Sequence, residues 1–273
     1  MSAAFLRTQN ASPRHQPRKA NMRLTPCLEL FFRELPFPDR IAAIADCGYQ
    51  AAEFWGYGNK DLTAVAAACQ KHGVTITSCT STCNNLLDSA NHDKYVHDFP
   101  ADIEAAKRLN CRNLIVLSGN VVPGRTRCEM SKAVISGLKR LAPMAEAAGI
   151  TLLLELLNSA VNHPGYFIDN SEEMAGVVRA VDSPAVKALY DVYHGGIMEG
   201  NVLSKIMANL DIIGHFHAAG IPGRHELASG EQNYPFICRQ IDAAGFDGYL
   251  GLEYIPLQES RASLLETREW LHA

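Results

Sequence analysis

The sequence predicts an α/β fold made of a single domain, a (β/α)8 or TIM barrel with eight parallel strands and eight helices. Two observations carry this prediction. Short apolar runs alternate with longer segments of helical character along the chain after residue 22, and this alternation is typical of a parallel sheet. In the second half, four of the apolar runs each end on a carboxylate or imidazole side chain. In parallel barrels the functional residues lie at the carboxyl ends of the strands.

Length and composition agree with one barrel. The chain has 273 residues, and barrels of about 250 residues form single domains. No run of about 18 apolar residues suggests a membrane span, so no membrane partner is expected. The net charge is -4 and the predicted domain shows no basic stripe, which argues against a nucleic-acid partner. A small molecule is the expected substrate, and the broad helical faces of a barrel leave room for association into a homo-oligomer.

The cysteine pattern predicts a cytoplasmic protein. None of the eight cysteines forms a CxxC pair or has zinc-ribbon spacing, and several lie in apolar runs. Reduced thiols in a core are typical of cytosolic proteins. The cysteines are Cys27, Cys47, Cys69, Cys79, Cys83, Cys111, Cys128 and Cys238.

Residues 1–22 are expected to form a flexible basic extension that precedes a barrel domain of residues 23–273. Several basic residues precede the first acidic residue, Glu29, in a background of Ser, Pro, Gln and Asn. Such a segment buries too little apolar surface to offset the entropy of ordering it. A transit peptide is the alternative, since it would also be rich in Arg and poor in acidic residues, whereas the apolar segment of a secretion signal is missing.

The first half of the chain predicts four strand and helix pairs. Strands are expected at residues 24–30, 50–55, 74–79 and 113–117, and helices at 38–47, 61–72, 93–110 and 128–148. Gly48, Gly73 and Gly149 follow three of these helices directly, which is the usual position for a glycine that ends a helix.

The second half predicts four further pairs. Strands are expected at residues 150–155, 186–191, 212–217 and 249–253, and helices at 171–180, 202–209, 234–243 and 260–271. Runs of four to six mostly apolar residues are too short for helices and indicate strands buried on both faces. The eight pairs together complete a barrel.

Four strand ends form the candidate metal site. They carry Glu155, Asp191, His217 and Glu253, which would converge if the sheet closed. Three carboxylates and one imidazole suit Mn²⁺ or Mg²⁺ and tolerate Co²⁺, and the lack of Cys ligands argues against a structural zinc site. Taken singly, each residue more often caps a helix or pairs with a base, but four at successive strand ends favour a shared cation.

Three neighbouring residues leave alternatives open. His215 competes with His217, because alternate residues of a strand share a face; His217 is preferred because it lies nearer the rim. Glu53 and Trp55 end the second strand. Trp55 would form either an apolar wall of the substrate pocket or ordinary core packing.

Several short strings resemble hydroxypyruvate isomerases and their close relatives among the xylose-isomerase-like barrels, which include ketose 3-epimerases. The resemblance runs from about residue 24 to the end of the chain. The strings are EFW (53–55), LNS (157–159), HPGYF (163–167), YDVYH (190–194), IMEG (197–200), PGRHE (222–226) and GLEY (251–254).

The resemblance implies a metal held by Glu155, Asp191, His217 and Glu253. It also implies substrate contacts from His194 and from Arg224. The sequence departs from hydroxypyruvate isomerases in two places: these tend to carry Gln at position 217, where epimerases carry His, and they often have Pro after the first metal-binding Glu, where this chain has Leu156.

The predicted activity is a metal-dependent isomerase that interconverts a small 2-oxo acid or hydroxy-ketone and its aldehyde isomer through an enediolate, most like hydroxypyruvate to tartronate semialdehyde. A cation stabilises the enediolate charge, and Glu155 and Glu253 are the expected acid and base. The alternatives are a 2-oxo-tetronate isomerase, a ketose 3-epimerase, an endonuclease IV-like nuclease or a non-catalytic binding barrel. A nuclease would need more His and Asp ligands and a basic rim.

Substrate charge points to a further cation in the pocket. Three carboxylates and a divalent ion leave a net charge near -1, so a 2-oxo acid needs another positive group. Arg224 in the seventh loop, with His225 beside it, is the candidate, because a guanidinium holds a carboxylate through two hydrogen bonds. The alternative is that Arg224 pairs with Glu226 or Glu231. His194 would either bind a substrate oxygen or orient Asp191 or Glu253.

Overall fold

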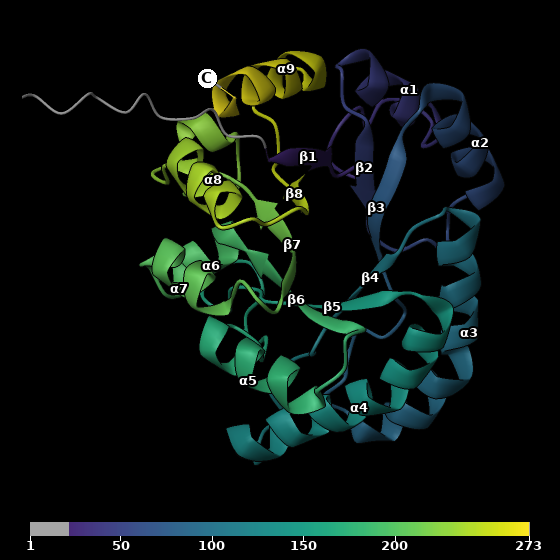
Figure 1. The fold of residues 1–273 in the computed structure, drawn as a ribbon, viewed down its shortest axis with the longest axis vertical. Coiled ribbons are helices and arrows are strands. Elements are labelled where there is room, and N and C mark those ends of the chain that lie inside the picture. The colour runs from purple at the N-terminus through teal and green to yellow at the C-terminus, as the bar shows by residue number, and fades with distance from the viewer. Residues whose placement is uncertain (1–21, 273) are drawn as a thin grey trace, which may run out of the picture.

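The computed structural model describes residues 22–272 and places eight parallel strands in the order β1-β8-β7-β6-β5-β4-β3-β2. The helices surround this ring of strands (Figure 1). The predicted barrel architecture is confirmed. The strands are β1 (Arg23–Pro26), β2 (Ala51–Phe54), β3 (Thr75–Thr80), β4 (Asn113–Val116), β5 (Thr151–Glu155), β6 (Val186–Asp191), β7 (Ile213–Ala218) and β8 (Tyr249–Leu252).

The ring is nearly closed, and its seam lies between β1 and β2. These strands stand at the two ends of the strand order. In the described residues one bridge joins β2 to the chain just after β1, between Glu53 and Cys27, and the backbone N–H of Leu28 donates to the carbonyl of Glu53 at 2.8 Å. Glu53 therefore takes part in closing the barrel.

Nine α-helices cover the strands in the described residues, one more than predicted. They are α1 (Asp39–Asp46), α2 (Leu62–His72), α3 (His92–Arg108), α4 (Arg127–Ala148), α5 (Ser171–Val181), α6 (Val192–Met198), α7 (Val202–Asn209), α8 (Tyr234–Ala243) and α9 (Ser260–Leu271). Two short 3-10 helices, η1 (Ser89–Asn91) and η2 (Leu227–Ser229), lie in the connections.

Local sequence signals set the helix ends. Thr126 and Glu129 form a capping box at the start of α4, which satisfies backbone N–H groups that have no partner inside the helix. Gly73 and Gly149 end α2 and α4 with φ angles of 66° and 67°, a left-handed conformation that glycine adopts without strain. The predicted positions of these two helix ends are confirmed.

The structure corrects two predicted elements. The first strand was expected to reach residue 30, but it ends at Pro26, because the chain then turns and the N–H of Leu30 donates to the carbonyl of Cys27 at 3.0 Å. Helix α6 was not predicted. It begins directly after β6, where the Asp191 side chain accepts a hydrogen bond from the N–H of His194.

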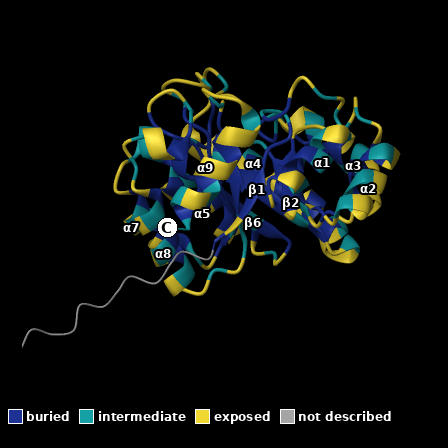
Figure 2. Ribbon diagram, turned by 90° about the horizontal axis from the view of Figure 1, so that it is seen from above, coloured by how far each residue is buried: buried dark blue, intermediate teal, exposed yellow. Residues whose placement is uncertain are grey.

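The core fills both sides of the strands. Buried residues concentrate on the strands at the centre of the molecule, and exposed residues on the loops and outer helix faces (Figure 2). Inside the ring, Ile115, Leu153 and Leu189 form a small apolar cluster. Since side chains alternate along a strand, Leu153 and Leu189 share a face with Glu155 and Asp191. The polar groups at these strand ends therefore lie on an apolar floor.

The basic extension predicted for residues 1–22 falls almost entirely on residues 1–21, which lie outside the described residues. Met22, which was predicted to belong to the extension, is buried, and β1 starts at Arg23. No helix within residues 22–272 has the length and apolar character needed to cross a membrane.

Candidate metal centre and active site

The structure brings Glu155, Asp191, His217 and Glu253 together at the carboxyl ends of β5 to β8. Glu155 and Asp191 are the last residues of their strands, His217 is the last but one of β7, and Glu253 follows β8. All four are buried, and each offers one ligand atom within 4.8 Å of the others. We call these residues the four-residue group.

His217 stands at the centre of the four-residue group. Its Nδ1 lies 2.9 Å from Oε1 of Glu155 and 3.3 Å from Oε2 of Glu253. Burial alone would lower the pKa of His217, but Glu53, Glu253 and Glu155 outweigh burial and raise it well above the usual value. The imidazole therefore supplies the positive charge that balances the surrounding carboxylates.

Two carboxyl groups of the four-residue group resist ionisation. Burial raises the pKa of Glu155 to about 6, and His217 only partly opposes this effect. Burial likewise raises the pKa of Asp191 to about 6, with Glu253 adding like-charge repulsion against the opposing effect of His217. Crowded, buried carboxylates of this kind are stabilised by a nearby cation.

Glu253 is held as a carboxylate by the side chains around it. Arg224 donates from Nη2 to Oε2 at 2.6 Å, and Trp55 donates from Nε1 to Oε1 at 2.6 Å. Burial would raise the pKa of Glu253, but Arg224 and His217 outweigh it and hold this pKa far below the usual range.

A cavity of about 310 Å³ opens onto this site. Its size suits a small molecule. Its lining combines polar and charged side chains with apolar ones. The lining residues are Trp55, Gly56, Thr80, Ile115, Leu117, Glu155, Leu157, His163, His217, Arg224 and Glu253.

The donor set fits a hard divalent cation. Three carboxylates and one imidazole converge with their ligand atoms within reach of one ion, and oxygen-rich sets of this kind suit Mg²⁺ or Mn²⁺ better than ions that prefer thiolates. Burial raises the pKa of both Glu155 and Asp191, and a bound cation would stabilise the ionised forms of these carboxyl groups. The residues present therefore fit the metal that the sequence predicts.

His194 lies behind Asp191. Its backbone N–H donates to Oδ1 of Asp191 at 2.9 Å, and its Nε2 lies 3.6 Å from Oδ2. Its Nδ1 lies 2.6 Å from Nδ2 of Asn158. Burial, followed by Arg224, lowers the pKa of His194 well below its usual value. His194 is not among the residues that line the cavity, and its contacts with Asp191 agree with the orienting alternative.

The other predicted substrate contacts divide into two groups. Trp55 and Arg224 line the cavity, and Arg224 pairs with Glu253 rather than with either Glu226 or Glu231. His225 is not among the residues that line the cavity: it is half-buried, and its Nδ1 lies 2.9 Å from the carbonyl oxygen of Ile255. Trp55 keeps 41% of its surface exposed, so it forms the open side of the pocket wall.

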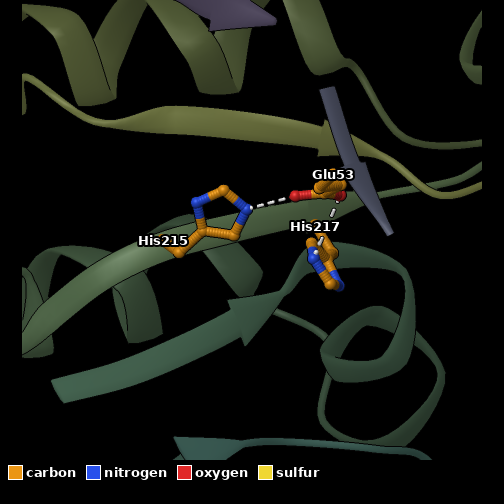
Figure 3. A group of neighbouring side chains, drawn as sticks. All are labelled: Glu53, His215 and His217. Atoms are coloured by element: carbon orange, nitrogen blue, oxygen red, sulfur yellow. Dashed lines mark hydrogen bonds and ion pairs between the residues drawn. The ribbon is translucent and has the colours of Figure 1, made fainter. Parts of the chain in front are cut away.

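Two further buried polar side chains, for which no role was predicted, lie beside His217. Glu53 on β2 and His215 on β7 meet there at 2.8 Å, next to His217 (Figure 3). His215 was predicted only as a competitor of His217, and Glu53 only as a strand end. Asn158 was also missed. Because side chains point to alternate faces along a strand, the sequence indicates that His215 and His217 share a face of β7. No local sequence pattern indicates that these two residues contact β2.

Comparison with known proteins places this architecture in a family. The family described as xylose isomerase-like TIM barrel matches residues 41–273. The chain belongs to this family. The resemblance seen in the sequence is thus confirmed, and so is the barrel fold.

Relatives within the family carry isomerase names. The chain is 30% identical over 254 residues to a Danio rerio protein named as a hydroxypyruvate isomerase, covering 88% of this chain and 91% of that protein. It is also 30% identical over 254 residues to a 2-oxo-tetronate isomerase of Pectobacterium atrosepticum, covering 89% and 96%. The predicted assignment to an isomerase of this family is confirmed.

Solved structures agree on the fold. A crystal structure from Brucella melitensis described as AP endonuclease, family 2, has a TM-score of 0.86 and 28% identity, covering 91% of this chain and 99% of that one. A D-psicose 3-epimerase from Clostridium cellulolyticum with D-tagatose has a TM-score of 0.74 and 18% identity, covering 90% of each chain. At that identity the second likeness shows the fold alone.

Proposed function

We propose that the protein is a metal-dependent isomerase that interconverts a small 2-oxo acid or hydroxy-ketone and its aldehyde isomer, with hydroxypyruvate and tartronate semialdehyde as the best-supported pair. One observation carries this proposal: four ligand atoms lie within 4.8 Å of one another beside a cavity of about 310 Å³. The site thus has room for one ion and a small substrate molecule. The names of the two relatives at 30% identity support this substrate class.

Glu155, Asp191, His217 and Glu253 would hold the cation, with Mn²⁺ or Mg²⁺ favoured and Co²⁺ tolerated. When bound, a divalent cation acts as a Lewis acid toward the substrate carbonyl and stabilises the enediolate charge by several kcal/mol. Glu155 and Glu253 both line the cavity, from β5 and the end of β8. From these two positions one group, as a carboxylate, would remove the proton from the carbon next to the carbonyl, and the other, as a carboxylic acid, would give a proton to the former carbonyl carbon, while the substrate hydroxyl proton passes to the former carbonyl oxygen.

Arg224 would hold the substrate carboxylate. The three carboxylates of the four-residue group and a divalent cation sum to a charge of -1, and the guanidinium brings this sum to zero. Arg224 lines the cavity while its Nη2 donates to Glu253, and a guanidinium has five N–H donors. A 2-oxo acid can therefore enter without meeting a net negative charge.

Two alternatives use the same site. A 2-oxo-tetronate isomerase would need space for a longer hydroxylated acid, and the relative from Pectobacterium atrosepticum favours it. A ketose 3-epimerase would act on a neutral sugar, and His217 favours it, since the resemblance implies His at this position in epimerases. All eight cysteines are unpaired, which supports a reducing compartment such as the cytoplasm.

The decisive experiment is a screen of 2-oxo acids and hydroxy-ketones with added Mn²⁺, Mg²⁺ or Co²⁺, comparing wild type with Glu253→Gln. We expect turnover that requires a cation, and a loss of about 10²- to 10⁴-fold in kcat for Glu253→Gln, because a positioned acid or base contributes that much. Glu226→Gln is the matched control. Glu226 is also a buried carboxylate, but its hydrogen bonds go to the Leu257 N–H and to Ser263.

Several outcomes would contradict the proposal. Turnover that persists after chelation of all divalent cations would exclude a metal centre. If the substrate carbon exchanges its proton with solvent equally fast in wild type and in Glu253→Gln, Glu253 has no part in the mechanism.

Arg224→Gln separates the substrate classes. The KM should rise about ten- to a hundredfold for a 2-oxo acid, given 1.5–3 kcal/mol for a hydrogen bond to a charged group, and it should change little for a neutral ketose. Nicking of abasic DNA with no isomerase activity would favour a nuclease instead.

A further inference from the structure

Glu53 is a buried carboxylate that the proposed reaction does not use. It lies on β2 and is 2% exposed, and it meets His215 and His217 of β7 inside the barrel (Figure 3). It does not line the substrate cavity, whereas His217 does. Glu53 therefore contacts the four-residue group through His217.

The two oxygens of Glu53 have different surroundings. Oε2 accepts hydrogen bonds from Oγ of Ser78 at 3.0 Å and from Nε2 of His215 at 2.8 Å. Oε1 is 3.3 Å from Nε2 of His217. Among residues 22–272, neither Oε1 nor that Nε2 has another hydrogen-bond partner, although both are buried. Each atom is thus the natural partner of the other.

Gly251 leaves room for this contact. In the register of β7 and β8, Gly251 lies opposite His217. A Cβ at this position would overlap Oε1 of Glu53 and would lie 2.5 Å from Cδ2 of His217. A glycine here is explained by the close approach of these two side chains, since real Cβ atoms do not make contacts this short.

The opposite nitrogen of His217 faces the four-residue group. Nδ1 lies 2.9 Å from Glu155 and 3.3 Å from Glu253. A histidine that binds a metal through one nitrogen commonly donates its other N–H to a carboxylate, which fixes the tautomer and the ring orientation. The arrangement of Glu53, His217 and the four-residue group has this form.

We propose that Glu53 is a positioning residue, which accepts a hydrogen bond from Nε2–H of His217 and so presents the lone pair of Nδ1 to a divalent cation held by the four-residue group. Ser78 and His215 fix the carboxylate in this orientation. This inference rests on the cation site of the proposed function. It adds a role for β2, the strand at the seam of the barrel, in a site otherwise built from β5 to β8.

The same three residues, Glu53, His215 and His217, also offer ligand atoms within 4.8 Å of one another, so a second cation is the competing interpretation. The contacts favour positioning. Oε2 of Glu53 already accepts two hydrogen bonds at 2.8 and 3.0 Å. The cavity reaches neither Glu53 nor His215.

Glu53→Gln tests the proposal because it changes one proton rather than the shape of the side chain. Ser78 and His215 both donate to Oε2, so the amide oxygen of Gln would take that place and its NH2 group would face Nε2 of His217. The imidazole would then accept on Nε2 and carry its proton on Nδ1. That tautomer cannot bind a cation through Nδ1.

Two measurements are needed. The electron paramagnetic resonance signal of free Mn²⁺ gives the number of bound Mn²⁺ ions and their affinity, and the visible spectrum of the Co²⁺-loaded protein reports the geometry of the cation site. We expect one ion per chain in wild type, an affinity about 10- to 100-fold weaker in Glu53→Gln, and an altered Co²⁺ spectrum. Gly251→Ala should weaken binding in the same direction, because it displaces Glu53 from His217 without removing a polar group. Glu226→Gln should bind Mn²⁺ as wild type does.

Thermal melting without cation separates positioning from folding. Suppose that Glu53→Gln or Gly251→Ala lowers the melting temperature but leaves the affinity for Mn²⁺ at the wild-type value. The role of Glu53 would then be purely structural, and the inference would be overturned. Two ions per wild-type chain, one of which is lost in Glu53→Gln, would establish the second-cation interpretation instead. A wild-type chain that binds no divalent ion would reject the proposed metal centre itself, and the role of Glu53 with it.

Discussion

At the scale of single residues, the site crowds three carboxyl groups around one imidazole, and a cation would stabilise the ionised forms of these carboxyl groups. Glu253 is ionised and paired with Arg224, whereas burial raises the pKa of Glu155 and Asp191 to about 6. A metal requires deprotonated ligands. Protons and a divalent cation therefore compete for the same oxygens.

This competition predicts a pH dependence of cation affinity. Between pH 7 and pH 5, Glu155 and Asp191 pass from mostly ionised to mostly protonated, since their pKa lies near 6. Each contributes about a tenfold loss, so the affinity for Mn²⁺ should fall at least about a hundredfold as the pH decreases. Titration calorimetry in buffers of different ionisation heat would measure both the affinity and the protons released. An affinity that stays constant from pH 7 to pH 5 would contradict this prediction.

The sequence was enough to predict which polar residues stand at the strand ends. It was not enough to predict which side chains on different strands contact one another across the barrel. Glu155, Asp191, His217 and Glu253 stood out because each follows an apolar run. The contacts of Glu53 with His215 and of Arg224 with Glu253 join side chains 162 and 29 residues apart. They depend on strand register and on the path of one loop, which no local pattern encodes.

At the scale of elements, Asp191 belongs to both a strand and a helix. It ends β6, and its Oδ1 accepts the His194 N–H at the first turn of α6. This helix escaped prediction because it has only seven residues, two of them Gly195 and Gly196, and follows the strand without a loop. The helix cap in turn fixes the orientation of the Asp191 carboxylate.

The double role of Asp191 predicts different outcomes for two substitutions. Asp191→Asn keeps an N-cap acceptor and removes the buried charge, whereas Asp191→Ala also loses the cap. Both should abolish tight Mn²⁺ binding. Without cation, Asp191→Ala should unfold with a free energy about 1 kcal/mol lower than Asp191→Asn, the usual contribution of an N-cap. Urea denaturation in the presence of a chelator would measure this difference, and equal stabilities of the two variants would show that the cap is unimportant.

At the scale of the whole molecule, the barrel was predictable because eight short apolar runs with helices between them allow few other arrangements. The sequence did not predict that strand pairing would be much shorter at the seam between β1 and β2 than between the other neighbouring strands. Each strand from β2 to β8 pairs with the next along a ladder, and β8 pairs with β1, but in the described residues one bridge joins β2 to the chain after β1. The chain turns just after Cys27, and only the folded backbone shows how little ladder remains for β2.

The four-residue group joins four neighbouring strands, so a bound cation should stabilise the barrel as a unit. A ligand that binds only the folded state adds RT ln(1 + [L]/Kd), about 2.7 kcal/mol at a hundred times Kd. Six cysteines are buried, and Cys128 on α4 is exposed. If the buried thiols react only after global unfolding, Mg²⁺ at that concentration should slow their modification about a hundredfold and leave Cys128 unchanged.

Cys128 is the internal control for this measurement, because its reaction reports reagent activity and not unfolding. Mg²⁺ is the suitable ion, since it binds thiolates poorly. Mass spectrometry of the modified chain separates Cys128 from the buried cysteines Cys27, Cys47, Cys79, Cys83, Cys111 and Cys238. Asp191→Asn should lose the protection, because it weakens the cation site while keeping the helix cap. Buried thiols that react at the same rate with and without Mg²⁺ in wild type would show that the four strands are not held together by a shared ion.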